Sequence, residues 1–214
     1  MGTDLSLYLV TDRSLAKGRP LAAIVEAAIR GGVTAVQYRE KDLSTREMIE
    51  EAGTLAAICR RLGAIFIVND RLDVALAVGA GGLHVGQDDM PARMARSFLG
   101  SGRLLGVSAG SLEEALRAQA DGADYIGASP LFSTPTKPDA GPALGYEGLA
   151  AMSAGLTLPV VAIGGIGIAN AGAAIEAGAS GLAVVSAIVA AEDVEAAARS
   201  LRAEIDKAAK GGKS

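Results

Sequence analysis

The stretch Gly31-Gly-Val-Thr-Ala-Val-Gln37 decides the fold, because it joins a helix stop, a tight turn and a short buried strand. Its two glycines follow an Ala-rich amphipathic segment, and an apolar, β-branched run comes directly after them. The same design returns at Asp121–Gly127 (DGADYIG) and at Ala177–Val185 (AGASGLAVV). A recurring helix–turn–strand unit predicts alternating helices and parallel strands.

Working outward from this unit, the chain contains eight apolar runs, each followed by a polar or Gly-rich cluster and an amphipathic stretch. The predicted strands are Leu7–Val10, Ala35–Tyr38, Ile65–Val68, Leu83–Val85, Leu104–Val107, Tyr125–Ile126 with its neighbours, Val160–Ile163 and Leu182–Val185. The predicted helices are Leu21–Arg30, Thr45–Leu62, Leu72–Val78, Ala92–Leu99, Leu112–Ala120, Gly148–Ala154, Ala169–Ala177 and Val194–Ile205. Eight such units favour an α/β fold with a single (β/α)8 TIM barrel over 1–214, with 208–214 as a frayed tail. A doubly wound open sheet is the alternative.

Composition narrows the classes of partner. The net charge is −4 and no basic face is visible, so we expect no nucleic acid partner. No apolar run reaches membrane-spanning length and no signal peptide pattern is visible, so we expect no membrane partner and a cytoplasmic protein. The single cysteine, Cys59, excludes an internal disulfide. The oligomeric state stays open, with a homo-oligomer as one alternative.

In a TIM barrel the active site lies at the C-terminal ends of the strands. Gln37, Arg39 and Lys41 follow the second predicted strand at alternate positions, so strand geometry points all three to one side. Together they could bind one anion, with Arg39 as a planar fork and Lys41 as a compact charge. The alternative is a solvated strand end with surface ion pairs to Glu40 or Asp42.

Two polar pairs that carry carboxylates, Asn69-Asp70 and Asp88-Asp89, end the third and fourth predicted strands. Carboxylates brought together at neighbouring strand ends suit a hard cation such as Mg²⁺, which substrate phosphate oxygens and waters complete. The alternative is helix capping, which we expect for one of Asp88 and Asp89.

Gly164-Gly165 follows the apolar run that ends at Ile163. A glycine pair between a strand and a helix exposes backbone N–H groups, which suits a phosphate, and the loop at Val185-Ser186 can donate more. A plain tight turn is the alternative.

His84 is the only histidine, and it lies inside a predicted strand. We therefore expect a hydrogen-bonded histidine in the barrel interior, and no Ser-His-Asp triad or histidine metal site. The chemistry must rely on a metal, cations and positioned hydroxyl groups.

Strings along nearly the whole chain resemble the thiamine-phosphate synthase family in order and spacing. They are YLVTD (8–12), QYREK (37–41), VNDR (68–71), LHVGQDD (83–89), GVSAG (106–110), STPTK (133–137), VVAIGGI (160–166) and VVSAI (184–188). The resemblance implies Mg²⁺-dependent coupling of 4-amino-2-methyl-5-hydroxymethylpyrimidine diphosphate to 4-methyl-5-(2-phosphoethyl)thiazole. Pyrophosphate leaves first, and the thiazole nitrogen captures the resulting pyrimidine-methyl cation.

The resemblance also implies roles for individual residues. Asp70 and Asp89 would hold the metal, and Arg39, Lys41, Ser108 and Lys137 would be catalytic. The pyrimidine diphosphate would contact Gln37, Arg39, Lys41, Asn69, Ser108 and Lys137. The thiazole phosphate would contact Thr134, Thr136, Gly165, Val185 and Ser186.

The sequence departs from the family pattern at Gly110, where relatives often carry His, at Ala128-Ser129-Pro130, and at Ser133, where Pro is common. A thiazole tautomerase of similar sequence is one rival, but it uses a histidine near the position of Gly110. A non-catalytic phosphate-binding barrel is the other, and metal dependence would separate it from an enzyme.

Overall fold

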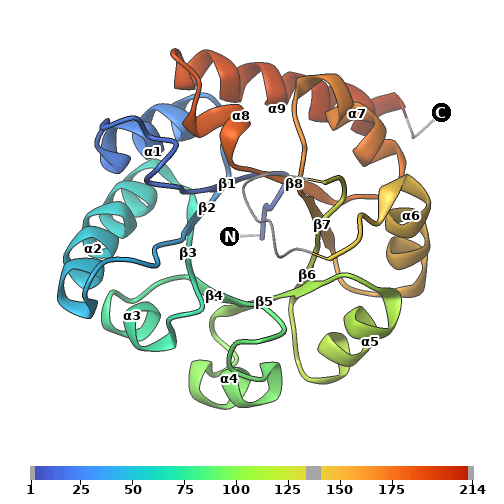
Figure 1. The fold of residues 1–214 in the computed structure, drawn as a ribbon, viewed down its shortest axis with the longest axis horizontal. Coiled ribbons are helices and arrows are strands. Elements are labelled where there is room, and N and C mark those ends of the chain that lie inside the picture. Colours follow the sequence, from blue (N-terminus) through green and yellow to red (C-terminus); the bar gives the residue numbers. More distant parts are fainter. Residues whose placement is uncertain (1–2, 134–140, 212–214) are drawn as a thin grey trace.

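The computed structural model describes residues 3–133 and 141–211, and its centre is a closed barrel of eight parallel strands (Figure 1). The strands are β1 (Leu7–Val10), β2 (Ala35–Tyr38), β3 (Ile65–Asn69), β4 (Gly82–Val85), β5 (Leu104–Ala109), β6 (Tyr125–Ala128), β7 (Val160–Ile163) and β8 (Gly181–Val184). The predicted TIM barrel is confirmed, and the open-sheet alternative is excluded because β1 pairs with both β2 and β8.

Helices surround the barrel, one after each of β1 to β7 and two, α8 and α9, after β8 (Figure 1). They are α1 (Leu21–Arg30), α2 (Thr45–Leu62), α3 (Leu72–Ala77), α4 (Ala92–Leu99), α5 (Leu112–Ala120), α6 (Gly145–Gly155), α7 (Ile168–Glu176), α8 (Ser186–Val189) and α9 (Val194–Gly211). Within the described residues, no helix combines the length and apolar character needed to cross a bilayer.

Three helix predictions need correction. The short α8 was not predicted, and α6 begins at Gly145 rather than at Gly148. The last helix continues beyond its predicted end at Ile205 to Gly211, so it includes 208–211 of the expected tail, and Ala208 is buried against the rest of the protein. Residues 212–214 lie outside the described residues.

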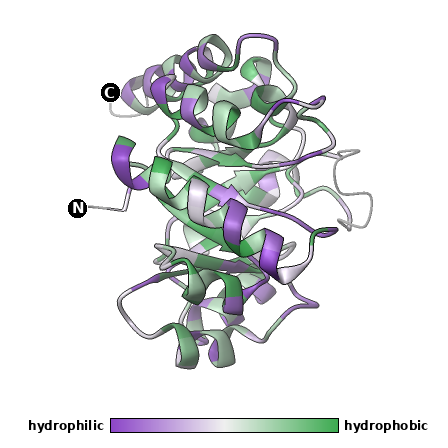
Figure 2. Cartoon of the chain, turned by 90° about the vertical axis from the view of Figure 1, so that its left-hand side faces the viewer, coloured by the Kyte–Doolittle hydropathy of each residue, from purple (hydrophilic) through white to green (hydrophobic). Residues whose placement is uncertain are grey.

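The outer core lies between the strands and the helices. Outward-facing strand residues such as Val36 and Leu83 pack against buried helix residues, among which alanine is the commonest type and the rest are mainly Leu, Ile and Val. Small side chains let the helices approach the sheet closely, which explains how so few aromatic residues suffice. In Figure 2 the strands are mostly green, while much of the purple lies on the surrounding helices and loops. Cys59 belongs to this core, and burial raises its pKa to about 12, so the thiol stays protonated.

Local signals set several of the helix ends. Ser44 and Glu47 form a capping box at the start of α2. At α5, Ser111 accepts a hydrogen bond from the Glu114 N–H, but the Glu114 carboxylate accepts from the Gly110 N–H and not from that of Ser111, so only half of a capping box exists there.

Where β1 and β8 close the ring, the two backbones approach very closely. A Cβ atom on Gly181 would lie 2.0 Å from the carbonyl oxygen of Leu5, so only glycine fits at this position. The register pairs Tyr8 with Ala183, which completes the barrel.

Candidate active site

A cavity of about 470 Å³ opens at the C-terminal ends of the strands. It is lined by every predicted site residue that the structure describes: Gln37, Arg39, Lys41, Asn69, Asp70, Asp89, Ser108, Gly165, Val185 and Ser186. The remaining predicted residues, Thr134, Thr136 and Lys137, lie outside the described residues. One rim therefore brings together residues from six of the strand ends.

Asp70 and Asp89 lie side by side in this cavity. The backbone of Asp70 is left-handed, with φ of 60°, a conformation that aspartate tolerates better than most residues. The pKa of Asp70 is raised to about 7, chiefly by burial and then by the hydrogen bond and charge of Asp89. Lys41 and Arg39 act in the opposite direction, so both cations lie close enough to influence this carboxyl.

The helix-capping expectation for the Asp88-Asp89 pair is wrong. Helix α4 begins after Pro91 without any side-chain cap. Asp89 instead accepts a hydrogen bond of 2.7 Å from the Gly86 N–H, which closes the turn after β4 and fixes the carboxylate toward Asp70. Asp88 lines the cavity as well.

The described residues contain no group of three or more His, Cys, Asp or Glu side chains placed to hold a metal ion. A cation bound here would have two protein carboxylates and would need further oxygen ligands. That donor set suits a hard, octahedral ion that keeps waters and binds phosphate oxygens.

Hydrogen bonds to the backbone fix the segment that carries the two cations. The Arg39 N–H donates to the Oγ1 of Thr11, a fully buried residue, over 3.0 Å. The Glu40 carboxylate accepts from the Lys41 N–H and pairs with Arg13 at 2.7 Å. Among the described residues no ion pair engages Arg39 or Lys41, so the alternative of a surface ion pair to Glu40 or Asp42 is not what the structure shows.

The turn after β7 lies on the same rim. Gly164 and Gly165 have φ of 107° and 66°, which favours glycine, and a Cβ atom on Gly165 would lie 2.9 Å from that of Phe132. Asn170, which the sequence did not single out as a site residue, holds this turn. Its Oδ1 accepts from the Gly167 N–H at 2.8 Å, and its Nδ2 donates to the Gly165 carbonyl at 2.9 Å.

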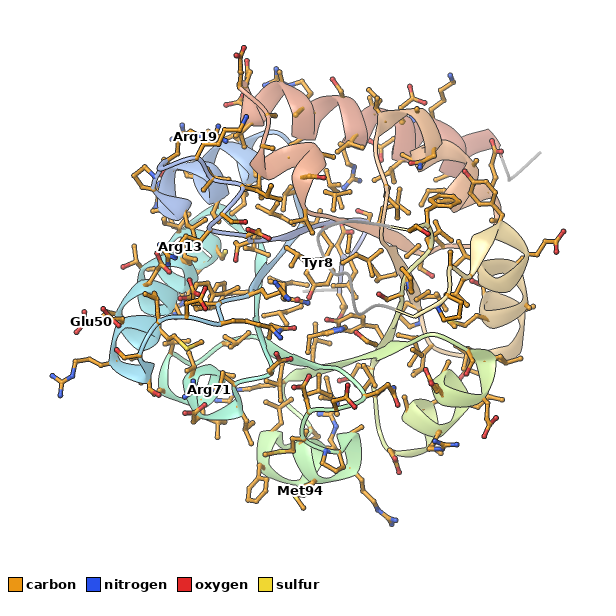
Figure 3. All side chains as sticks on the ribbon, viewed as in Figure 1. Tyr8, Arg13, Arg19, Glu50, Arg71 and Met94 are labelled. Carbon is orange, nitrogen blue, oxygen red and sulfur yellow. The ribbon has the colours of Figure 1, made fainter. Side chains whose placement is uncertain are left out.

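A chain of hydrogen bonds crosses the barrel interior below the rim. The Gln37 Nε2 donates to the Tyr8 hydroxyl at 3.0 Å, and the Tyr8 and Tyr125 hydroxyls are 2.9 Å apart. His84 lies 3.0 Å from the Tyr125 hydroxyl through Nδ1 and 2.9 Å from the Ser108 Oγ through Nε2. Figure 3 labels Tyr8 near the centre of the ring of strands. The expected barrel-interior histidine is confirmed, whereas the sequence did not predict that two tyrosines would line the cavity.

The family model for thiamine monophosphate synthase matches residues 7–188 of the chain. The chain belongs to the thiamine monophosphate synthase family. It is 60% identical to the thiamine-phosphate synthase of Chloroflexus aurantiacus over 200 residues, which are 94% of this chain and 92% of that protein. It is 50% identical to that of Moorella thermoacetica over 202 residues, which are 94% and 96% of the two chains.

Solved structures agree with this assignment to the thiamine monophosphate synthase family. The thiamine phosphate pyrophosphorylase of Pyrococcus furiosus superposes with a TM-score of 0.88 at 42% identity, covering 96% of this chain and 97% of that one. A 3-hexulose-6-phosphate synthase matches with a TM-score of 0.66 at 20% identity and so shares the fold alone. The resemblance found in the sequence is therefore confirmed for the family.

Proposed function

We propose that this chain is a transferase that joins the pyrimidine diphosphate to the thiazole phosphate, giving thiamine phosphate and pyrophosphate. The family and the relatives support this reaction. The observation that carries it is that two cations and two carboxylates meet in one cavity, which also holds a Gly-rich turn. This arrangement suits two phosphorylated substrates.

We further propose that Asp70 and Asp89 hold Mg²⁺. Their carboxylates lie together, one fixed by the Gly86 N–H, and the pKa of Asp70 is raised first by burial and then by the hydrogen bond and negative charge of Asp89. A divalent cation would relieve that repulsion and, when bound, neutralise charge on the diphosphate.

The roles of the protein groups follow from the chemistry. The bond between the pyrimidine-methyl carbon and the diphosphate oxygen breaks, and its electron pair leaves with pyrophosphate. Arg39 and Lys41 would stabilise the charge that grows on this leaving group, where preorganised cations contribute most. The lone pair of the thiazole nitrogen then forms the new carbon–nitrogen bond, so this step needs no general base.

The thiazole phosphate would bind on the opposite part of the rim. Gly165 lines the cavity there, as do Val185 and Ser186 where α8 begins, and their backbone N–H groups would bind the phosphate. The contacts of Lys137, Thr134 and Thr136 with substrate stay predictions from the resemblance, because these residues lie outside the described ones.

The tautomerase rival is less well supported. Its histidine would stand near Gly110, whose N–H is bonded to the Glu114 carboxylate. The only histidine of the chain, His84, lies in the barrel interior with both ring nitrogens in hydrogen-bonding contact. A non-catalytic barrel would have no reason to place Asp70 and Asp89 beside Arg39 and Lys41.

The test is to mix both substrates with Mg²⁺, with and without a chelator, and to measure thiamine phosphate. We expect product only when the metal is present. Asp70→Ala and Arg39→Ala should abolish coupling, while Asp73→Ala, which removes an exposed carboxylate three positions from Asp70, should not. Chelator-resistant turnover would refute the metal role, and near-normal turnover in Asp70→Ala or Arg39→Ala would refute the role of that residue. The cytoplasmic location and a homo-oligomeric state stay predictions from the sequence.

A further inference from the structure

Five side chains from five different strands form one continuous hydrogen-bonded chain in the barrel interior. The residues at its two ends, Gln37 and Ser108, are those expected to contact the pyrimidine substrate. The three between them, Tyr8, Tyr125 and His84, have no role in the proposed reaction. All three line the floor of the cavity.

We propose that Tyr8, Tyr125 and His84 are positioning residues that fix the direction of the Ser108 hydroxyl group. They hold its oxygen as an acceptor toward His84, so that its hydrogen points into the cavity as a donor to substrate. The identity of the group that the Ser108 hydroxyl binds rests on the proposed function. The direction of the hydrogen bonds from Gln37 to Ser108 does not.

The direction follows from counting donors, starting at Gln37. The amide nitrogen of Gln37 can only donate, so the Tyr8 oxygen accepts there. Either hydroxyl could donate between Tyr8 and Tyr125, but among the described residues Tyr125 is the one acceptor within reach of the Tyr8 proton, so we assign that proton to Tyr125. Tyr125 then has its own proton left for His84 Nδ1. His84 therefore carries its proton on Nε2 and donates it to the Ser108 Oγ, which leaves the serine proton free for the cavity.

Burial keeps this chain intact and in one direction. Tyr8 and Tyr125 are each 1% exposed, so water cannot replace a missing partner. Burial also raises the pKa of both tyrosines, so both phenols keep their protons at neutral pH. Neighbouring hydrogen bonds of this kind polarise one another, which favours a single ordered arrangement.

Two glycines make room for the rings. Gly106 lies in register between His84 and Tyr125, and a Cβ atom there would lie 2.5 Å from His84 Nδ1 and 2.1 Å from Tyr125 Cζ. Gly127 pairs with Ser108, and its Cβ would lie 3.0 Å from His84 Cε1. The rings of His84 and Tyr125 therefore meet in space that side chains at positions 106 and 127 would otherwise fill.

The two residues at the ends of the hydrogen-bonded chain then present a donor and an acceptor to substrate. Ser108 offers a hydrogen-bond donor, and the Gln37 side-chain carbonyl remains as an acceptor. An aminopyrimidine carries ring-nitrogen acceptors and an exocyclic amine donor, so it matches this pair. The interior chain would thereby help to select the amino heterocycle.

The first test reads the direction without any substrate. Because His84 is the only histidine, an untagged protein labelled with ¹⁵N-histidine gives one pair of imidazole nitrogen resonances. Near pH 8 we expect the neutral tautomer with its proton on Nε2. A proton on Nδ1, or on both nitrogens, would overturn the inference whether or not the enzyme assay succeeds.

The second test asks whether the tyrosines act through Ser108. Tyr125→Phe should lower kcat/KM for the pyrimidine diphosphate about tenfold, the scale of one lost hydrogen bond in a buried site. The KM for the thiazole phosphate should stay within about twofold. In a Ser108→Ala background the same change should cost nothing more, because the hydroxyl it orients is gone. Tyr8→Phe should be milder, because the bonds from Tyr125 to His84 and from His84 to Ser108 remain.

Tyr38→Phe is the matched control. Tyr38 is a buried strand tyrosine whose hydroxyl donates to Glu51 at 2.8 Å and takes no part in the hydrogen-bonded chain from Gln37 to Ser108. It should lose stability without changing the kcat/KM for the pyrimidine diphosphate. Equal losses from Tyr125→Phe in the presence and absence of the Ser108 hydroxyl would show a merely structural role and overturn the proposal. An inactive wild-type enzyme would instead refute the proposed function and leave the ¹⁵N result standing.

Discussion

Replacing Gly106 with alanine should lower the free energy of unfolding more than the addition of a methyl group at almost any other position. The new Cβ would lie 2.1 Å from Tyr125 Cζ, 2.3 Å from the Tyr125 hydroxyl oxygen and 2.5 Å from His84 Nδ1. Neither ring can move into the cavity without breaking a hydrogen bond, because Tyr125 is hydrogen-bonded to Tyr8 and His84 to Ser108. The clash must therefore separate His84 from Tyr125 or displace strand β5.

Two contributions set the size of the effect. Overpacking a well-packed interior costs about 1–3 kcal/mol. Breaking the bond between His84 and Tyr125 leaves buried polar atoms without partners, which costs about 1–3 kcal/mol more. We expect a loss of roughly 3 kcal/mol in the free energy of unfolding, or a Tm lower by about 6–12 °C for a chain of this size.

Gly53→Ala is the control for a glycine-to-alanine change. Gly53 lies inside helix α2, and a Cβ atom there would meet nothing within 4 Å. Alanine should stabilise that helix by about 0.5–1 kcal/mol. Urea denaturation and thermal unfolding of both variants measure the difference. If Gly106→Ala stayed within about 0.5 kcal/mol of wild type, the packing argument would be wrong, since surface changes alone reach that size.

Three further predictions concern the metal, the phosphate turn and a helix cap. The folded-state pKa of Asp70, about 7, lies above its ordinary value, so ionisation of Asp70 lowers stability as the pH rises toward and through about 7. Saturating Mg²⁺ should therefore raise Tm more at about pH 8 than at about pH 5.5, and the opposite order would contradict the carboxylate site. Asn170→Ala should remove the hydrogen bonds that hold the turn at Gly165 and Gly167, lowering the free energy of unfolding by about 1–2 kcal/mol. It should raise KM for the thiazole phosphate more than KM for the pyrimidine diphosphate. Equal changes in both KM values would count against this role. Ser44→Ala should cost about 1 kcal/mol through the lost capping box, and its steady-state kinetics should match wild type because α2 begins away from the cavity lining.

The order and number of strands could be predicted because each unit carries its own local signals. Apolar periodicity marks the strands, and glycines mark the helix ends, so most boundaries agree within one or two residues. Helix α8 could not be predicted, since Ser186–Val189 is a single turn and too short to show a period. The end of α9 was placed too early because packing of Ala208, rather than sequence pattern, keeps the last turn helical.

Residues at the strand ends could be predicted to share a cavity because the fold itself gathers them there. The interior chain could not, because Tyr8 and Tyr125 are 117 positions apart and meet only after the ring closes. One signal was available: a tyrosine in an otherwise apolar strand needs a partner for its hydroxyl group. The role of Asn170 depends on the path of the turn, which the sequence pattern does not specify.

The tight contact between Gly181 and Leu5 has a consequence for synthesis of the chain. Strand β1 pairs with β2 on one edge and with β8 on the other. Because β8 is the last strand to be synthesised, the second edge of β1 stays unpaired until β8 has left the ribosome. Such distant pairing slows folding and leaves an exposed edge in every shorter nascent chain. Active enzyme therefore appears only after translation has passed Val184.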